Sequence, residues 1–170
     1  TADIAMTLIL MTARRAGEGE RMVRAGQWAG WHPTQMLGMH VSGRTVCIIG
    51  MGRIGQAIAT RCHFGFGCKV IYANRSPKSV DFPATQMDLP AALAIADIVV
   101  VATPGGAETH HLMGAAQFAA MQRHALFINI SRGDVVDELA LIAALQADLI
   151  AGAGLDVYEC EPVVPQELIA

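Results

Sequence analysis

The sequence V-C-I-I-G-M-G-R-I-G, residues 46–55, has the order of a buried β-strand, a tight glycine turn and the start of a helix. Its first four residues are apolar without alternation, which is typical of a parallel strand covered on both faces. Gly50, Gly52 and Gly55 then follow the spacing G-x-G-x-x-G. Gly50 permits the turn, Gly52 lets the backbone approach a pyrophosphate, and Gly55 lets the helix pack closely on the strand. The N–H groups at the helix start would face a phosphate, so this stretch predicts a dinucleotide site.

The residues after this turn continue with a helical pattern. The apolar positions that recur at helical spacing are Ile54, Ala57, Ile58 and Cys62, with Gln56 and Thr60 facing away. An ordinary strand–turn–helix connection that binds no ligand would show the same pattern. We favour dinucleotide binding, provided that a second strand and residues suited to a ribose follow.

The composition indicates a domain that buries part of its surface against something else. The chain has 170 residues, of which 53% are hydrophobic and only 16% are charged. A soluble domain usually carries about 25% charged residues. We therefore expect large apolar faces to be covered by another domain or another subunit. The net charge of −3, without a basic block, argues against nucleic acid as a partner.

The cysteines and the apolar N-terminal run restrict the class of protein further. Cys47, Cys62, Cys68 and Cys160 form no C-x-x-C pair, and we interpret them as reduced packing residues of a cytoplasmic protein. A disulfide or a metal site is not expected. The apolar run 4–11 is far shorter than the ~20 residues that a membrane span needs. Its flanking charges also have the wrong order for a signal peptide, so no membrane association is predicted.

The first 44 residues differ from the rest of the chain. Residues 1–16 predict a helix that is apolar nearly all round and therefore buried on more than one side. Residues 17–44 contain several glycines together with Trp28 and Trp31, and they predict an extended arm with aromatic anchors. The alternative is a surface loop whose tryptophans fold back on their own domain. A long arm with two tryptophans favours packing on a partner chain, so we predict a homodimer.

Strand and helix patterns alternate through the remaining sequence. Further strands are predicted at 69–73, 98–102, 125–130 and 150–157, and helices at 89–96, 115–122 and 137–146, with a helical turn at 108–113 and a polar loop at 77–88. In the helix of 137–146, Asp137 is the expected N-cap, and the expected buried face consists of Leu139, Ile142 and Leu145. This alternation predicts an α/β fold with a Rossmann-type, doubly wound parallel sheet, preceded by the N-terminal helix and the dimerisation arm.

Polar residues follow several of these strands, at the sheet edge where such folds bind their ligands. The turns concerned are 50–55, 74–76, 103–106, 131–134 and 156–161. His110 and His111 lie near this edge but point in different directions on a helix, and they have no acidic partner at metal spacing. We interpret them as rim residues, and the remaining histidines, His32, His40, His63 and His124, as structural.

These segments together resemble the coenzyme-binding domain of the D-isomer-specific 2-hydroxyacid dehydrogenases. Residues 1–15 are similar to the inter-domain helix, 27–31 to the dimer arm and 50–55 to the phosphate turn. Residues 129–133 resemble the segment with the catalytic arginine of the family. Residues 154–162 resemble the segment with its nicotinamide-side aspartate and catalytic glutamate. The resemblance implies that 1–170 is one dinucleotide-binding domain, with the inter-domain helix and arm in 1–44 and the Rossmann core in 45–162.

The resemblance also implies site residues. The catalytic residues would be Arg132 and Glu161, and the cofactor-binding residues would be Gly50, Gly52, Arg53, Ile54, Gly55, Asn74, Arg75, Ser76, Thr103, Pro104, Thr109, Ile130, Ser131, Arg132 and Asp156. On spacing alone, Arg132 could equally form a surface salt bridge, and Glu161 could be a solvated loop carboxylate. The catalytic histidine of the family lies in a Pro-His segment that this chain lacks, as it lacks the substrate domain. We therefore expect this chain alone to bind cofactor without measurable catalysis.

The activity that the resemblance implies is the NAD(P)H-dependent reduction of a small 2-keto acid. Residues 74–76 and 103–106 are most similar to the glyoxylate/hydroxypyruvate reductase branch. A dinucleotide-sensing module, as in corepressors that share this fold, is the alternative. We predict NADP as the preferred cofactor and NAD as the weaker one. A carboxylate after the second strand would repel a 2′-phosphate, and this chain has Asn74 there, followed by Arg75 and Ser76.

Overall fold

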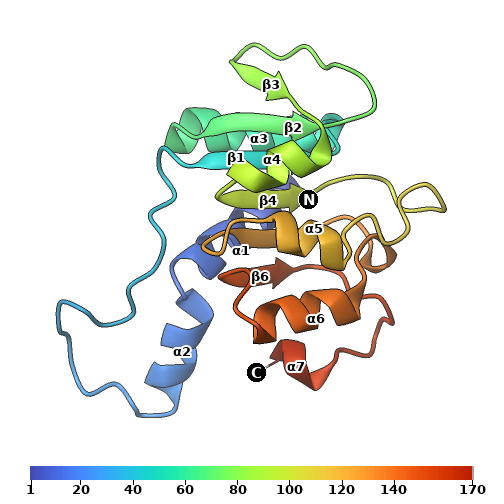
Figure 1. Cartoon of the computed structure of the whole chain (residues 1–170). Coiled ribbons are helices and arrows are strands. Elements are labelled where there is room, and N and C mark those ends of the chain that lie inside the picture. Colours follow the sequence, from blue (N-terminus) through green and yellow to red (C-terminus); the bar gives the residue numbers. More distant parts are fainter. Residues whose placement is uncertain (170) are drawn as a thin grey trace.

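Parallel strands form one continuous sheet through the middle of the computed structural model, which describes residues 1–169 (Figure 1). The strands are β1 (Thr45–Ile49), β2 (Lys69–Ala73), β3 (Ala84–Gln86), β4 (Ile98–Val101), β5 (Leu126–Asn129) and β6 (Gly152–Leu155). Their order across the six-stranded sheet is β3-β2-β1-β4-β5-β6, and all neighbours are parallel. The chain builds outward from β1, returns to β4 beside it, and builds outward in the other direction. The predicted doubly wound Rossmann-type sheet is confirmed.

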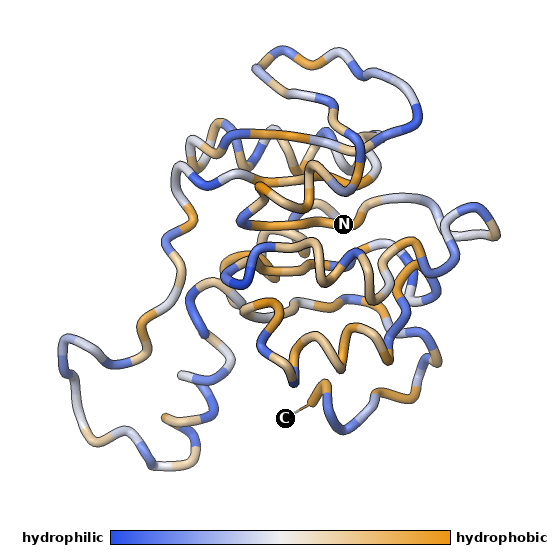
Figure 2. The backbone as a smooth tube through the Cα atoms, in the orientation of Figure 1, coloured by the Kyte–Doolittle hydropathy of each residue, from blue (hydrophilic) through white to orange (hydrophobic). Residues whose placement is uncertain are grey.

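Helices cover both faces of this sheet. They are α1 (Ala2–Ala13), α2 (Ala16–Arg24), α3 (Arg53–Phe66), α4 (Leu89–Ile95), α5 (Ala115–Ala120), α6 (Glu138–Gln146) and α7 (Gln166–Ile169), with a 3-10 turn at Gly133–Val135. Helices α1 and α3 cover one face, and α4, α5 and α6 cover the other (Figure 1). Ile48 of β1 packs with Ile9 and Ile58 on the first face, whereas Ile49 packs with Leu93 on the second. This double cover explains why the central strands are apolar without alternation (Figure 2).

The glycines of β6 let the N-terminal helix lie against the sheet. A Cβ atom on Gly154 would come within 2.8 Å of Oγ1 of Thr12, and one on Gly152 within 3.2 Å of Cγ2 of the same threonine. Helix α1 is shorter than the predicted 1–16, because Arg15 takes a left-handed conformation with φ of 54° and begins a new helix. The buried residues of this helix are Ala5, Met6, Ile9 and Ala13, whereas Ile4 and Met11 are exposed, so the structure of the single chain shows burial on one side and not on the predicted additional side.

The segment 17–44, predicted as an extended arm, is partly helical, because α2 occupies its first residues. Arg15 pairs with Glu18 and Arg24 pairs with Glu20, and ion pairs at these helical spacings support a helix despite its glycines. After α2 the chain has no helix or strand until β1, and it extends away from the body of the domain before it returns (Figure 1). No helix within residues 1–169 has the length and apolar character that crossing a bilayer requires.

Two short elements differ from the sequence prediction near the second strand and after the fourth. The predicted polar loop 77–88 contains β3, whose residues pair with β2 from Val70↔Ala84 to Tyr72↔Gln86. This edge strand has only three residues and is largely exposed, so it shows no apolar pattern. The segment 108–113, predicted as a helical turn, forms non-helical turns instead.

Helix α6 begins as predicted but buries a different face. The side chain of Asp137 accepts a hydrogen bond from the backbone N–H of Ala140 at 3.0 Å, so the predicted N-cap is confirmed. Leu141 and Ala144 are the buried residues, whereas Leu139 is 77% exposed. The prediction that Leu139 is buried was wrong, because this helix is apolar on most sides and its sequence alone does not select one face.

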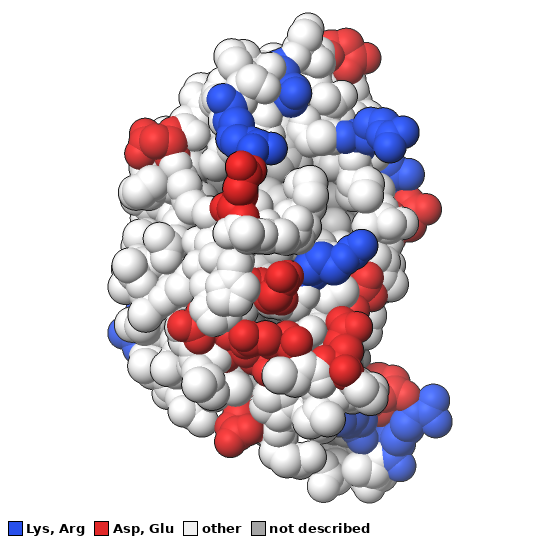
Figure 3. Space-filling view, turned by 90° about the vertical axis from the view of Figure 1, so that its right-hand side faces the viewer, with Lys and Arg blue, Asp and Glu red and all other residues white. Residues whose placement is uncertain are grey.

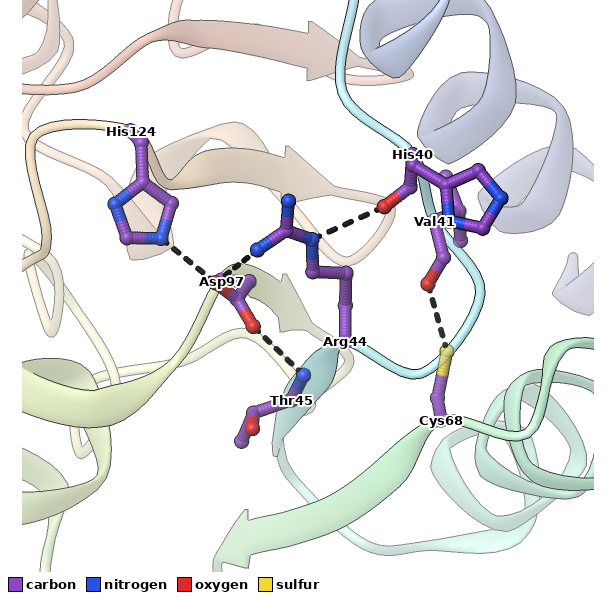
Figure 4. A network of polar contacts seen from close by, with 7 residues as sticks. All are labelled: His40, Val41, Arg44, Thr45, Cys68, Asp97 and His124. Carbon is purple, nitrogen blue, oxygen red and sulfur yellow. Dashed lines mark hydrogen bonds and ion pairs between the residues drawn. The ribbon is translucent and has the colours of Figure 1, made fainter.

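A polar network at the opposite, amino edge of the sheet fixes the starts of the central strands (Figure 4). Asp97, just before β4, accepts hydrogen bonds from the backbone N–H of Thr45 at 2.8 Å and from Nε2 of His124 at 2.6 Å. Its carboxylate also pairs with Arg44 at 3.4 Å, and Arg44 donates to the carbonyl of His40 at 3.0 Å. The network therefore ties the end of the arm to β1 and β4.

This network predicts an acid-sensitive contribution to stability. Burial acts to raise the pKa of the Asp97 carboxyl, but Thr45, His124 and Arg44 together hold that pKa below its ordinary value of 3.8. The contribution is therefore complete above 3.8 and is lost as the pH falls through the lower, folded-state pKa. We expect Asp97→Ala to lower the free energy of unfolding near neutral pH by about 2 kcal/mol, because the Thr45 N–H loses its acceptor.

Urea unfolding near neutral pH and again below the folded-state pKa tests this prediction. The difference in the free energy of unfolding between wild type and Asp97→Ala should be largest near neutral pH and should become smaller in acid. Asp81→Ala is the matched control, since Asp81 is an exposed loop carboxylate. Equal unfolding free energies of wild type and Asp97→Ala near neutral pH would contradict the assignment.

Candidate functional site

The glycine turn between β1 and α3 has the geometry of a phosphate-binding turn. Gly50 has a φ of 96°, and a Cβ there would lie 2.8 Å from the backbone of Ala102 and Thr103. A Cβ on Gly55 would lie 2.2 Å from the carbonyl oxygen of Gly50, so helix and turn are packed backbone to backbone. A Cβ on Gly52, in contrast, would meet nothing within 4 Å. Gly50 and Gly55 therefore serve the fold, and Gly52 borders open space.

The start of α3 faces that open space. Gly52 is the N-cap of the helix, and no side chain caps its first N–H groups. Arg53 and Ile54 are both exposed at this end. The expectation that Ile54 belongs to the buried face of α3 was therefore wrong; that face consists of Gly55, Ile58, Ala59 and Cys62. Uncapped N–H groups beside a glycine that leaves room for a ligand fit a pyrophosphate.

Asn74, at the end of β2, connects the second strand to the glycine turn. Its side-chain oxygen accepts a hydrogen bond from the N–H of Met51 at 3.2 Å, and its side-chain nitrogen donates to the carbonyl of Ser76 at 2.7 Å. The carbonyl of Asn74 accepts a bond from Gln86 of β3 at 2.7 Å. The polar residues predicted at 74–76 thus lie directly beside the turn.

Arg75 has an acidic partner that the sequence did not indicate. Its Nη1 lies 2.5 Å from Oε2 of Glu108, in the loop after β4, and both side chains are more than three-quarters exposed. The ion pair joins the loops that follow β2 and β4 across this edge of the sheet. A carboxylate is therefore present near the predicted 2′-phosphate position, although it comes from a distant part of the sequence.

The loop after β4 contains three of the predicted site residues, Thr103, Pro104 and Thr109. It contacts the glycine turn at Gly50 and the side chain of Arg132. The Oγ1 atom of Thr103 is buried and has no hydrogen-bond partner among the described residues. Thr109 donates to the carbonyl of Pro104 at 2.8 Å and so closes the loop. A Cβ on Gly105 would lie 2.8 Å from Cγ of Arg132, which shows how closely this loop covers that side chain. The unpartnered Thr103 hydroxyl is a further feature that a bound polar ligand fits.

Asn129 organises the segment that holds Arg132. This buried amide accepts hydrogen bonds from the N–H of Ser131 at 3.0 Å and its hydroxyl at 2.9 Å, and it donates to the carbonyl of Arg132 at 3.1 Å. The carbonyl of Asn129 accepts a bond from the N–H of Asp156 at 3.0 Å. Asn129 was not among the expected site residues, although a single amide in an otherwise apolar strand is a signal that could have indicated it.

The segments that hold Arg132 and Glu161 are in direct contact. A Cβ on Gly133 would lie 1.9 Å from the carbonyl oxygen of Tyr158, so only glycine permits this approach. The N–H of Tyr158 donates to Oε1 of Glu161 at 3.0 Å. Both segments follow neighbouring strands, β5 and β6, at the same edge as the glycine turn. The predicted catalytic residues are thus carried by touching loops.

Many acidic side chains lie at the carboxyl edge of the sheet. Figure 3 looks onto the carboxyl ends of the strands and shows acidic side chains collected across the middle of the face, with a basic side chain beside them. The acidic residues in the segments directly after β5 and β6, 130–138 and 156–161, are Asp134, Asp137, Glu138, Asp156, Glu159 and Glu161. Within residues 1–169, no group of three His, Cys, Asp or Glu side chains is placed to hold a metal ion.

Residues 6–170 match the model of the D-isomer specific 2-hydroxyacid dehydrogenase family, NAD binding domain. The chain belongs to this family. It is 50% identical over 165 residues to glyoxylate/hydroxypyruvate reductase B of Cronobacter sakazakii, which covers 95% of this chain and 51% of that protein. It is 44% identical over 177 residues to glyoxylate reductase of Thermococcus onnurineus, covering 100% and 53%. The chain spans about half the length of the curated relatives it matches.

Solved structures of this family superpose closely on the domain. A D-isomer specific 2-hydroxyacid dehydrogenase from Polaromonas sp. JS6 66 gives a TM-score of 0.93 at 45% identity, over 97% of this chain and 52% of that one. An NADPH-dependent glyoxylate/hydroxypyruvate reductase from Sinorhizobium meliloti, in complex with NADP and malonate, gives 0.91 at 39% identity, over 99% and 53%. The family and fold expected from the sequence are confirmed.

Proposed function

We propose that this chain is the coenzyme half of an enzyme that reduces a small 2-keto acid, of the glyoxylate or hydroxypyruvate type, to the D-2-hydroxy acid. The observation that carries the proposal is the contact between the Arg132 and Glu161 segments beside the glycine turn. The proposed organisation is one dinucleotide-binding domain, with residues 1–44 as inter-domain helix and dimer arm and 45–162 as the Rossmann core. The relatives' greater length supports a separate substrate domain.

The residues of this edge suit that reaction. The bound dinucleotide supplies a hydride. Arg132 can hold the substrate carboxylate and polarise the adjacent carbonyl, because a guanidinium offers several charge-assisted donors in one plane. One oxygen of Glu161 is held by the N–H of Tyr158. Its carboxylate is suited to orient a proton-donating histidine and to favour the protonated imidazole.

Turnover by the two-domain enzyme, meaning this chain completed by its substrate domain, tests the proposal. We expect NADPH consumption to depend on glyoxylate or hydroxypyruvate. The 170-residue chain alone should bind the cofactor without turnover. Cofactor binding by the two-domain enzyme without any turnover would contradict the proposal and would favour a dinucleotide-sensing module.

We also propose that Arg75 makes NADPH the preferred cofactor, with NADH bound more weakly. A 2′-phosphate brings a charge of roughly −1.5 to −2, more than the single charge of Glu108, so Arg75 can exchange one partner for the other. We expect an NADPH dissociation constant roughly three- to tenfold below that of NADH, since exposed ion pairs are weak. Arg75→Ala should abolish the difference. Glu108→Gln should strengthen NADPH binding by about two- to fivefold and leave NADH unchanged.

Dissociation constants for both cofactors, measured on this chain by titration, decide the matter. Arg61→Ala is the matched control, because Arg61 forms a similar exposed ion pair, with Asp3, on α1 and α3. It should change neither constant. Equal affinity of the wild type for both cofactors would refute the preference, and a preference that survives Arg75→Ala would exclude Arg75 as its source.

We further propose a homodimer formed through α1 and the arm. Trp28 and Trp31 are 55% and 80% exposed, although large aromatic side chains usually find apolar cover. With Met22, Val23 and Met36 they line a pocket of about 230 Å³. Sedimentation at micromolar concentration should show a dimer, and the variant with both Trp28→Ser and Trp31→Ser should be a monomer. A wild-type monomer at that concentration would eliminate this interface.

We also propose that the protein is located in the cytoplasm. All four cysteines are free thiols, and Cys47, Cys62 and Cys68 are buried. Burial raises the pKa of Cys47 and Cys62 to about 12, so both stay protonated and unreactive. Reduced, buried thiols agree with a reducing compartment.

A further inference from the structure

His111 makes a bond at the carboxyl edge that none of the cofactor-binding or catalytic roles uses. Its Nε2 donates to Oε1 of Glu159 at 2.9 Å, and its backbone N–H donates to the carbonyl of Asp134 at 2.8 Å. The residue adopts a left-handed conformation with φ of 50°, which side chains other than glycine rarely take. The surrounding contacts therefore hold His111 in a conformation that it would not favour alone.

Glu159 is also hydrogen-bonded to Glu138 at the start of α6. Its Oε2 accepts a hydrogen bond from the backbone N–H of Glu138 at 3.3 Å. In return, the backbone N–H of Glu159 donates to Oε2 of Glu138 at 3.2 Å. The half-buried carboxylate of Glu159 thus has partners on two sides, one from the loop after β4 and one from the first turn of α6.

The same loop carries Glu161 only two residues further on. Gly133 touches the carbonyl of Tyr158, and the N–H of Tyr158 holds the Glu161 carboxylate. A hydrogen-bonded path therefore runs from His111 through Glu159 to the loop that holds Glu161. Without the His111 bond, this loop keeps its contact with Gly133 and its two bonds to Glu138, but it loses the bond to the loop after β4.

We propose that His111 is a positioning residue: acting through Glu159, it holds the loop 156–161 so that the Glu161 carboxylate stays in place beside the Arg132 segment. His111 itself does not touch the substrate. The inference rests on the proposed function, because it assigns His111 a task for the reaction in which Glu161 takes part. It also extends the interpretation of His111 as a rim residue, because the structure gives it an acidic partner, Glu159, that lies far away in the sequence.

Steady-state kinetics of the two-domain enzyme test the proposal. We expect His111→Ala to lower kcat roughly tenfold, within the ~10²-fold that a misplacement of about 1 Å can cost. KM for NADPH should change by less than about twofold, because the glycine turn is untouched. His111→Gln should recover most of kcat, since its amide nitrogen can reach the same carboxylate. His40→Ala is the control and should leave kcat unchanged, because the exposed His40 lies at the amino edge of the sheet and joins the network there through its backbone carbonyl.

Glu159→Ala removes the same bond from the other side and keeps the test valid if His111→Ala does not fold. The double variant should have the same kcat as Glu159→Ala alone, because both substitutions remove the same hydrogen bond. Additive losses, or a wild-type kcat in His111→Ala, would overturn the positioning role. Absence of turnover in the wild type would instead refute the proposed function itself, so the two failures are distinguishable.

Discussion

Replacing Arg132 by alanine should lower kcat of the two-domain enzyme by about a thousandfold while the NADPH dissociation constant changes by less than about twofold. In the proposed reaction, the Arg132 guanidinium both holds the substrate carboxylate and stabilises the charge that develops on the carbonyl oxygen. Loss of one such preorganised donor costs about 10²–10³ in kcat, and Arg132 supplies more than one. The cofactor turn keeps its own contacts through Gly50, Gly55 and Asn74.

Two further variants separate charge from geometry at this position. Arg132→Lys keeps the charge but loses the planar fork, so it should recover only a small part of kcat. Arg123→Ala is the matched control, because Arg123 is an exposed arginine before β5, at the amino edge of the sheet. Turnover close to the wild-type value in Arg132→Ala would show that this arginine has been misassigned.

Replacing Gly52 by valine should weaken NADPH binding by about a hundredfold without unfolding the domain. A Cβ on Gly52 meets nothing within 4 Å, so the fold has room for a side chain. That room lies where the uncapped N–H groups of α3 point, and a valine there would keep a pyrophosphate from reaching them. Two lost charge-assisted hydrogen bonds, at about 1.5 kcal/mol each, correspond to roughly a hundredfold in affinity.

The neighbouring glycine should behave in the opposite way. Gly55→Ala places a Cβ 2.2 Å from the carbonyl oxygen of Gly50, so we expect a loss of about 1–3 kcal/mol in the free energy of unfolding. Gly65→Ala is the control for both, since Gly65 lies in the same helix with open space around it. Thermal unfolding and NADPH titration of the three variants test the contrast. Unchanged NADPH affinity in Gly52→Val would remove the turn from the binding site.

The sequence was most informative where one short segment determines its own structure. Residues 46–55 predicted β1, the turn and α3, because a doubly covered strand and a glycine turn both leave a local signature. The prediction was wrong where packing against residues distant in the sequence determines the structure. Helix α2 contains glycines that argue against a helix, and Leu139 lies on a helix with no clear polar face. Strand β3 depends on its pairing with β2 more than on its own residues.

The same distinction applies to the candidate site. Each predicted segment lies at the carboxyl edge, because parallel strands bring their ends together. The partners that modify these segments come from far along the chain, and no local pattern indicates them. Arg75 pairs with Glu108, 33 residues away, and His111 with Glu159, 48 residues away. These long-range pairs are the features that require the three-dimensional structure.

The most direct test of the central claim is the transfer of label from cofactor to product. NADPH carrying deuterium at both C4 positions of the nicotinamide is incubated with the two-domain enzyme and glyoxylate or hydroxypyruvate, and the product is analysed by mass spectrometry. We predict deuterium on carbon 2 of the 2-hydroxy acid, in a yield equal to the NADPH consumed, and its loss in Arg132→Ala. Binding of labelled NADPH without any labelled 2-hydroxy acid would contradict the account.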